Sequence, residues 1–319
     1  MADAEAHIRS AIKKALALPT VPAVALAILR MSHDPRTSIE KLAETMAKDP
    51  ALAAKTLRFA NSSYYGASRP ILSLPQALVR IGVRRARMLA LSFSLIGARS
   101  RAGADGFNFT GFWHRSLTTS VVARRIALRS VRGLTEQAFI GALLADIGWP
   151  VLAAAFPQQY RGIEAMVATS QRDLVDVERG VLGTEHTRAA ALVLEAWHLP
   201  KALVDAVGAH HDLDRLDRDC EAFNVAAVIL TASDVADTIL RGVDRDRVKR
   251  MAATFRDCFS FGGDQIDLLL RGLGREVRTV GAMLDVRLPP VDQMQEEAKG
   301  EMLKLALNES DRDLVAETA

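Results

Sequence analysis

The sequence is poor in aromatic residues and in cysteine. Only 5% of its 319 residues are aromatic, and alanine and leucine are abundant, which favours helices. The two cysteines, Cys220 and Cys258, form neither a disulfide framework nor a metal-binding spacing. No cysteine nucleophile and no serine–histidine arrangement stands out. A reducing cytoplasm is therefore the expected location.

Long apolar runs and regular alternation are also missing. No apolar run reaches the ~20 residues that span a bilayer, and the uncharged segment 88–98 is too short. Asp3, Glu5 and His7 precede any apolar segment, unlike the start of a signal peptide. No segment alternates with a period of two for long enough to require a sheet. The sequence therefore predicts an all-α protein without membrane insertion and without a solenoid repeat.

Helix start and stop signals divide the chain. Thr37–Glu40 is a capping box that opens a helix through Ala47, and Asp49-Pro50 starts a second helix. Ser73–Gln76 caps a third helix, which ends near Gly82. Further candidate helices are 5–16, 23–31, 83–98, 110–130, 135–147, 150–156, 158–169, 173–180, 185–197, 201–209, 222–240, 245–260, 264–272, 275–285 and 293–307.

One carboxylate lies inside an apolar run. The segment Gly141–Gly148 has apolar residues at helical spacing, which predicts the last two turns of a buried helix, with Gly148 as a left-handed cap. Asp146 lies within it. Burying a carboxylate without a partner is costly, so we expect a cation of the fold, a helix end or a metal ion beside it.

Positive charge is concentrated in one segment. Residues 80–132 hold eleven arginines and one aspartate, a net charge of +10, whereas residues 291–319 have a net charge of −5. One interpretation is that both segments are solvated faces. The other is that the basic segment 80–132 forms a surface that binds a phosphate-bearing ligand or an acidic partner. Aromatic residues are not interleaved with these arginines, so nucleic acid is not favoured. The candidate ligand or partner surface consists of Arg84, Arg85, Arg87, Arg115, Arg124 and Arg125.

Ten motifs follow one another in a fixed order along the chain. They are Leu18–Pro22, Asp49–Ser62, Tyr65-Gly66, Ser73–Leu78, Ile81–Val83, Trp113–Ser116, Gly141–Gly148, Glu185-His186, Trp197–Pro200 and His210-His211. This ordered set resembles the HDOD domain family, a helical relative of the HD phosphohydrolases found in bacterial signalling. The resemblance covers residues 14–212. It implies an HD-like helical bundle with an N-terminal lobe (14–108) and an HD-like lobe (109–212). The C-terminal helical region (220–319) is expected to pack on the HD-like lobe, as Asp234 implies, and the alternative is a separate bundle.

The resemblance also implies where a metal ion would bind. The positions at which the wider HD superfamily places its metal ligands are His114, Asp146, His186, His210, His211 and Asp234. Such ligands suit iron, manganese, zinc or nickel, and the ion would activate a water against a phosphodiester.

The same six side chains have structural alternatives. For His114 the alternative is a hydrogen bond to a buried carbonyl or to Asp146, and for Asp146 it is a pair with His114 or with Arg115. The three other histidines have an alternative role at helix ends, where imidazolium or a cap is favourable. Asp234 and Asp237 are three residues apart on one helix face, and their alternative is a solvent-facing or arginine-paired edge.

One departure from the superfamily pattern decides the expected function. The defining His-Asp pair is Ala145-Asp146 here, and a methyl group cannot bind a metal or orient a water. We therefore expect a non-catalytic regulatory protein, without a cofactor, that binds a signalling protein or a cyclic or polyphosphorylated nucleotide. The alternative is a metal-dependent phosphohydrolase with a partial site. A third hypothesis is a scaffold that works by helix–helix contact alone, as a homodimer formed through its apolar C-terminal helices.

Overall fold

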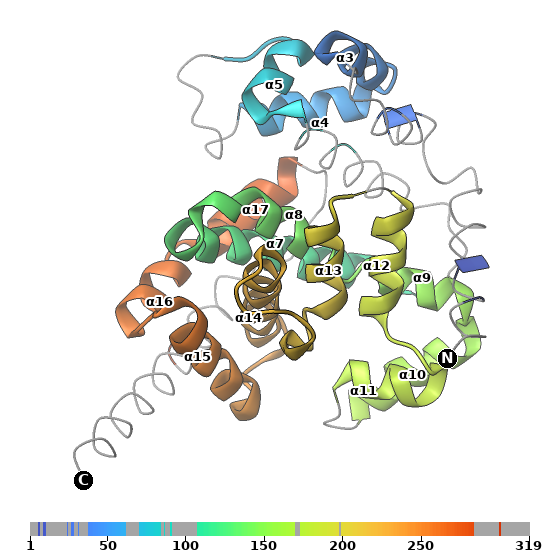
Figure 1. Cartoon of the computed structure of the whole chain (residues 1–319), viewed down its shortest axis with the longest axis vertical. Coiled ribbons are helices and arrows are strands. Elements are labelled where there is room, and N and C mark those ends of the chain that lie inside the picture. The colour runs from blue at the N-terminus through green and yellow to red at the C-terminus, as the bar shows by residue number, and fades with distance from the viewer. Residues whose placement is uncertain are drawn as a thin grey trace. The chain divides into compact units, whose positions relative to one another are not determined.

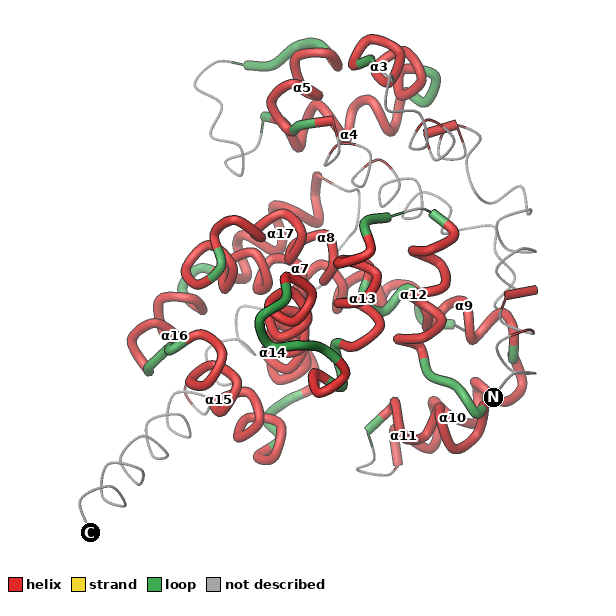
Figure 2. The backbone as a smooth tube through the Cα atoms, viewed as in Figure 1, coloured by secondary structure: helices red, strands yellow, loops and turns green. Residues whose placement is uncertain are grey.

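The structure is a computed structural model of the whole chain. It describes residues 38–61, 70–83, 107–169, 173–197 and 199–283, with isolated positions outside these ranges. Every regular element within the described residues is a helix, as Figure 2 shows, which confirms the all-α prediction. Apart from isolated positions, the predicted helices 5–16, 23–31 and 293–307 lie outside the described residues, as does most of 83–98.

The chain divides into two compact units. The first comprises residues 1–109, 146–204 and 283–285, and the second comprises 110–145, 205–282 and 286–319. The second unit thus combines helices on both sides of the predicted 212–220 boundary, because helices of the C-terminal region pack with helices that precede Asp146.

The first three described helices of the first unit form a small group at the blue end of Figure 1. They are α3 (Ile39–Ala47), α4 (Pro50–Ala60) and α5 (Leu74–Ile81), and each packs on the other two. Asp49 and Ser73 cap their helices as predicted, whereas α3 is capped by Ser38, one residue later than a capping box over Thr37–Glu40 requires. Ser38 Oγ accepts from Lys41 N at 3.2 Å, Asp49 Oδ1 from Leu52 N at 3.1 Å, and Ser73 Oγ from Gln76 N at 3.4 Å. Local side-chain chemistry therefore fixes where these helices begin.

Four further helices of the first unit carry part of the candidate site. They are α9 (Gly148–Ala155), α10 (Pro157–Thr169), α11 (Leu174–Leu182) and α12 (His186–Ala196). Helix α9 packs on α12 and on α10, and α10 packs on α11. Glycine at position 148 allows the first of these contacts, because a Cβ there would overlap the backbone carbonyl of His186 and lie 2.9 Å from Ala190 N.

The second unit is built around one long apolar helix. Helix α14 (Glu221–Arg241) packs against α15 (Arg245–Phe259) and against α8 (Thr135–Leu144). Figure 1 shows α14 beside α15. The other described helices of this unit are α7 (Phe109–Ser130) from Thr110 onward, the short 3₁₀ helix η1 (Arg132–Leu134), α13 (Lys201–Ala209) from Asp205 onward, η2 (Leu213–Arg215), α16 (Gly263–Leu270) and α17 (Leu273–Met283).

Two segments of the described chain, Arg132–Ala155 and Glu221–Arg241, are long and apolar enough to cross a membrane by length and composition. In each of them 78% of the apolar window is buried inside the structure. The first is also not one helix, since it contains η1, α8, a turn and α9. Burial of this extent is typical of core helices.

Candidate functional site

The apolar segment that holds Asp146 is a turn between two helices. Helix α8 ends at Leu144, residues 145–147 form a turn, and Gly148 is the first residue of α9. The predicted continuous helix through 147 is therefore wrong. The predicted left-handed cap is wrong too, because Gly148 does not have a positive φ. Asp146 is buried, with 1% of its surface exposed.

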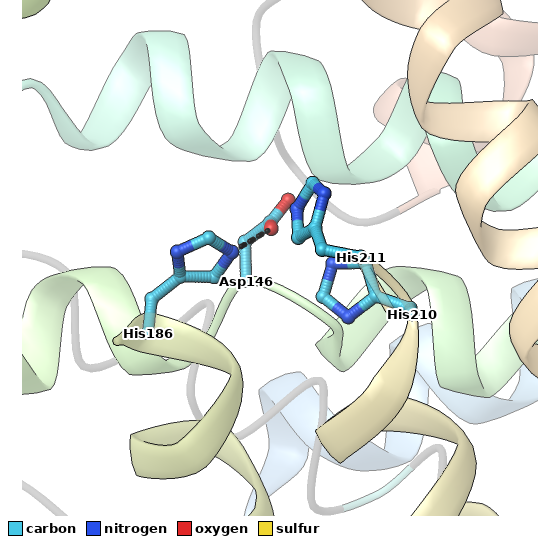
Figure 3. A group of neighbouring side chains, drawn as sticks. All are labelled: Asp146, His186, His210 and His211. Atoms are coloured by element: carbon cyan, nitrogen blue, oxygen red, sulfur yellow. Dashed lines mark ion pairs between the residues drawn. The ribbon is translucent and has the colours of Figure 1, made fainter. Parts of the chain in front are cut away.

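Asp146 has a histidine beside it. His186 is the first residue of α12 and is 1% exposed. Its Nε2 lies 3.5 Å from Asp146 Oδ1, the pair joined by a dashed line in Figure 3. Arg115, which the sequence offered as another partner, pairs elsewhere. The residue beside Asp146 is thus an imidazole, which is a cation only when it is protonated, and the expected cation, helix end or metal ion stays a prediction.

The other ring nitrogen of His186 is held by a carboxylate. Nδ1 lies 2.7 Å from Glu178 Oε2, and the backbone N–H of His186 donates to the same oxygen at 2.8 Å. Glu178 is fully buried on α11, and its Oε1 accepts from the Tyr160 hydroxyl at 3.1 Å. A ring whose Nδ1 is engaged in this way presents Nε2 to a ligand.

His210 and His211 lie in the turn that follows α13, at a helix end as predicted. His210 is completely buried, and its Nδ1 lies 2.8 Å from the carbonyl oxygen of Val207. The ring of His211 lies beside that of His210, with 4.2 Å between the ring centroids. Unlike His210, His211 is exposed. His210 therefore also presents Nε2, because its Nδ1 is held by a backbone carbonyl.

Four of the six predicted ligands come together. The ligand atoms of Asp146, His186, His210 and His211 all lie within 4.8 Å of one another (Figure 3). Two ligands at about 2.1 Å from one ion are about 3.0 Å apart at a right angle and about 3.4 Å apart at a tetrahedral angle. The 3.5 Å between His186 Nε2 and Asp146 Oδ1 matches the tetrahedral value. Three imidazoles and one carboxylate suit zinc, iron, manganese or nickel.

The other two predicted ligands are not members of this group. His114 lies on α7, and burial lowers the pKa of its imidazole. Asp234 lies on α14, where burial raises the pKa of its carboxyl to about 7, against the opposing effect of Arg250. Both groups are thus biased towards their neutral forms by burial.

Asp234 and Asp237 lie on α14, and Asp237 is paired with an arginine, as one of the alternatives predicted. Arg115 Nε donates to Asp237 Oδ1 at 2.8 Å, and its Nη2 donates to Oδ2 at 3.1 Å. Burial opposes ionisation of Asp237, but Arg115 and Arg241 outweigh it and lower the pKa of this carboxyl. Arg115 is 5% exposed, so it ties α7 to α14 and is no part of an open surface.

Two more of the predicted surface arginines are also engaged inside the second unit. Arg125 pairs with Glu276 at 2.6 Å and donates to the carbonyl oxygens of Leu269 and Arg271. Arg124 lies 3.8 Å from Glu276. These contacts join α7 to α16 and α17, so Arg124 and Arg125 are structural here. Arg84, Arg85 and Arg87 lie outside the described residues.

Glu178 and Tyr160 were not among the residues that the sequence motifs predicted. A signal for Glu178 was present, because Val175, Glu178 and Leu182 recur at i, i+3 and i+7 and so share the buried face of α11. A carboxylate on an apolar face needs a buried partner. The partner, His186, lies on the next helix, and nothing in the local pattern identifies it.

The comparisons with known proteins agree with this architecture. The family model of the HDOD domain matches residues 18–213. A solved structure from Shewanella amazonensis, whose name describes a candidate metal-dependent phosphohydrolase, is 17% identical, with a TM-score of 0.59 over 89% of this chain and 100% of that one. A structure from Marinobacter aquaeolei, named as a candidate signal transduction protein, is 23% identical, with a TM-score of 0.52 over 96% of this chain and 66% of that one. At these identities, the two structures show a common fold.

A curated relative is longer than the matched region. An uncharacterized protein of Treponema pallidum is 22% identical over 197 residues, which are 61% of this chain and 38% of the relative. The match thus spans well under half of that protein's length.

Proposed function

Since the chain belongs to the HDOD domain family, we propose that it is a non-catalytic protein of bacterial signal transduction. In this proposal it binds a partner protein or a signalling nucleotide and passes on the bound state. The observation that carries the proposal is Ala145. This residue occupies the first position of the His-Asp pair that defines the HD hydrolases, and it is fully buried beside Asp146.

The burial of Ala145 strengthens the argument from its chemistry. A methyl group supplies neither a metal ligand nor a proton donor to a reacting phosphate. The position is 0% exposed, so an imidazole there adds ring atoms where the backbone and neighbouring side chains already exclude solvent. An imidazole at this position therefore has to be accommodated inside the core.

The other polar side chains of the site are suited to bind a metal ion, although position 145 lacks an imidazole. We propose that Asp146, His186, His210 and His211 hold one divalent ion. A bound ion of this kind supplies Lewis acidity and lowers the pKa of a coordinated water. The protein residues bind and orient: Glu178 and the Val207 carbonyl fix the two buried rings, and Asp146 supplies negative charge. With four protein donors and a methyl group at position 145, we expect the ion to organise the fold around Asp146.

Elemental analysis and an activity assay test the proposal together. The full chain is purified, loaded separately with manganese, iron, zinc or nickel, and compared with Asp146→Ala. We expect bound metal in the wild type, much less in the variant, and no hydrolysis of cyclic dinucleotides or guanosine polyphosphates by either protein. Hydrolysis by the wild type that Asp146→Ala abolishes would show that the protein is an enzyme.

Ligand binding is measured in the same preparations. A nucleotide that binds only the folded protein raises its unfolding free energy by RT ln(1 + [L]/Kd), about 2.7 kcal/mol at one hundred times Kd. A thermal-shift series over nucleotide concentration therefore identifies a signalling ligand. No shift with any nucleotide would leave a protein partner as the proposed signal, to be sought by pull-down.

The second candidate is a phosphohydrolase with a partial site, which the retained donors favour. Ala145→His separates the two candidates because it restores the His-Asp pair. If the missing imidazole is what prevents catalysis, this variant gains metal affinity and measurable phosphodiester hydrolysis, at a cost in stability of about 1–3 kcal/mol from overpacking. If the wild type already hydrolyses the substrate as fast as the variant, the protein is a phosphohydrolase despite Ala145, and the first candidate is wrong.

A further inference from the structure

We propose that Glu178 is a positioning residue for His186, and that the chain Tyr160–Glu178–His186 sets the strength of this histidine as a metal ligand. The inference rests on the proposed metal site and adds to it a regulatory contact from α10 and α11. It concerns residues that do not touch the ion. Metal affinity would then depend on how Tyr160 of α10 and Glu178 of α11 hold the first residue of α12.

The geometry of Glu178 leaves its carboxylate little freedom. One oxygen accepts from the Tyr160 hydroxyl at 3.1 Å, and the other accepts from both the backbone N–H and Nδ1 of His186, at 2.8 and 2.7 Å. Tyr160 is 3% exposed and Glu178 is fully buried, so water does not compete for these bonds. Both oxygens are therefore committed, and the plane of the His186 ring is fixed.

This arrangement selects one tautomer of His186. A carboxylate at Nδ1 requires the proton there, which leaves the lone pair of a neutral ring on Nε2. Nε2 lies 3.5 Å from Asp146 Oδ1, which is long for a hydrogen bond and suitable for two ligands of one ion. A carboxylate behind a metal-bound histidine also increases its basicity, and loss of such a partner commonly weakens metal binding about 10–100-fold.

Charge favours the same interpretation. Asp146, Glu178 and His186 are all at most 1% exposed. A divalent cation at Nε2 and Oδ1 would lower the cost of burying a carboxylate beside this ring.

A matched pair of variants tests the inference. Glu178→Gln keeps the shape, because the amide oxygen can accept from both N–H groups and the amide nitrogen can donate to Tyr160, but it removes the negative charge. Glu185→Gln is the control: Glu185 is also buried and adjacent to His186, but it pairs with Arg179 and Thr187. We expect zinc affinity, measured by chelator competition on the full chain, to fall about 10–100-fold in Glu178→Gln and less than about twofold in the control.

A second readout does not depend on metal. In the metal-free protein labelled with ¹⁵N-histidine, the ring nitrogen shifts report the tautomer of His186, assigned by loss of its signals in His186→Gln. We expect the Nδ1-protonated form in the wild type and in Glu185→Gln, and a mixture in Glu178→Gln. A purely structural role for Glu178 would change stability without shifting this tautomer.

The outcomes separate the two proposals. If the wild type binds no zinc, the metal site is wrong, and the tautomer measurement alone decides the role of Glu178. An unchanged tautomer together with zinc affinity within about twofold of the wild type would overturn the positioning role. If Glu178→Gln does not fold, Tyr160→Phe replaces it, with an expected loss of zinc affinity of about two- to tenfold, and no loss would count against the inference.

Discussion

Two aspartates one turn apart on α14 should respond in opposite directions to the same substitution. Asp234 is 8% exposed, and burial raises the pKa of its carboxyl to about 7. Asp237 lies beside Arg115 and Arg241, which lower the pKa of its carboxyl despite burial. Replacing each in turn by asparagine keeps the side-chain shape and removes the ionisable group.

The pKa of Asp234 sets the magnitude for the first variant. An aspartate with an unfolded pKa of 3.8 and a folded pKa of about 7 keeps its proton longer in the folded state. Its ionisation contributes nothing below pH 3.8, destabilises the protein progressively from pH 3.8 to 7, and has its full effect above pH 7. At 1.36 kcal/mol per pKa unit, the full effect is about 4 kcal/mol. Asp234→Asn should therefore be more stable than the wild type by about 2 kcal/mol at pH 5 and about 4 kcal/mol at pH 8.

The second variant supplies the opposing control. Asp237→Asn leaves Arg115, which is 5% exposed, without its carboxylate partner. Breaking a buried ion pair on one side costs about 3–5 kcal/mol. Because the folded pKa of Asp237 is depressed, its stabilising effect is present above its unfolded pKa and is lost as the pH falls through the folded value. This loss should therefore be constant between pH 5 and 8.

Denaturant unfolding followed by circular dichroism measures both effects. The three proteins are compared at pH 5, 6, 7 and 8 in the presence of EDTA, so that metal binding does not contribute. A stability difference between Asp234→Asn and the wild type that does not change with pH would refute the reasoning. It would mean that Arg250 and Arg247 compensate the burial of Asp234 fully.

Two further substitutions test contacts within single units. Gly148→Ala places a Cβ against the His186 carbonyl and 2.9 Å from Ala190 N, so α9 must move away from α12. We expect the free energy of unfolding, measured with denaturant, to fall by about 1–3 kcal/mol. The control is Gly162→Ala, which should not be destabilised because nothing lies within 4 Å of the added Cβ. An equal effect at the two glycines would contradict the close approach of α9 and α12. Glu276→Ala removes the carboxylate that Arg125 contacts at 2.6 Å, and it should lower the free energy of unfolding by about 2 kcal/mol at low salt. The control is Glu195→Ala, at an exposed position near the end of α12, which should lower it by less than about 0.5 kcal/mol. Equal losses at the two glutamates would show that the Arg125 pair contributes no more than a surface charge.

The helix starts could be predicted because their causes are local. Ser38, Asp49 and Ser73 each accept a bond from a backbone N–H three residues later, and the sequence shows such a residue immediately before each apolar pattern. The ordered motifs also predicted the family, and the matched residues 18–213 agree closely with the expected 14–212. Four of the six proposed ligands lie together, although the pattern alone could not separate them from His114 and Asp234.

The missed features depend on contacts between helices. The apolar spacing of residues 140–147 suits a helix, but the chain turns at 145–147, and no proline marks the break. Arg115 and Arg125 looked like surface residues because their partners, Asp237 and Glu276, are more than 100 residues away. Charge patterning along the sequence cannot show an ion pair of this kind.

Gly148 joins the packing of the first unit to the chemistry of the site. The glycine lets the start of α9 approach the start of α12, where its missing side chain makes room for the carbonyl of His186. Asp146 lies two residues before this contact, and His186 is the contacted residue, so the same close approach brings Oδ1 to 3.5 Å from Nε2. A larger residue at 148 would therefore both destabilise the unit and separate the pair. The glycine of this segment thus acts through its small size, whereas the sequence pattern pointed to its conformational freedom.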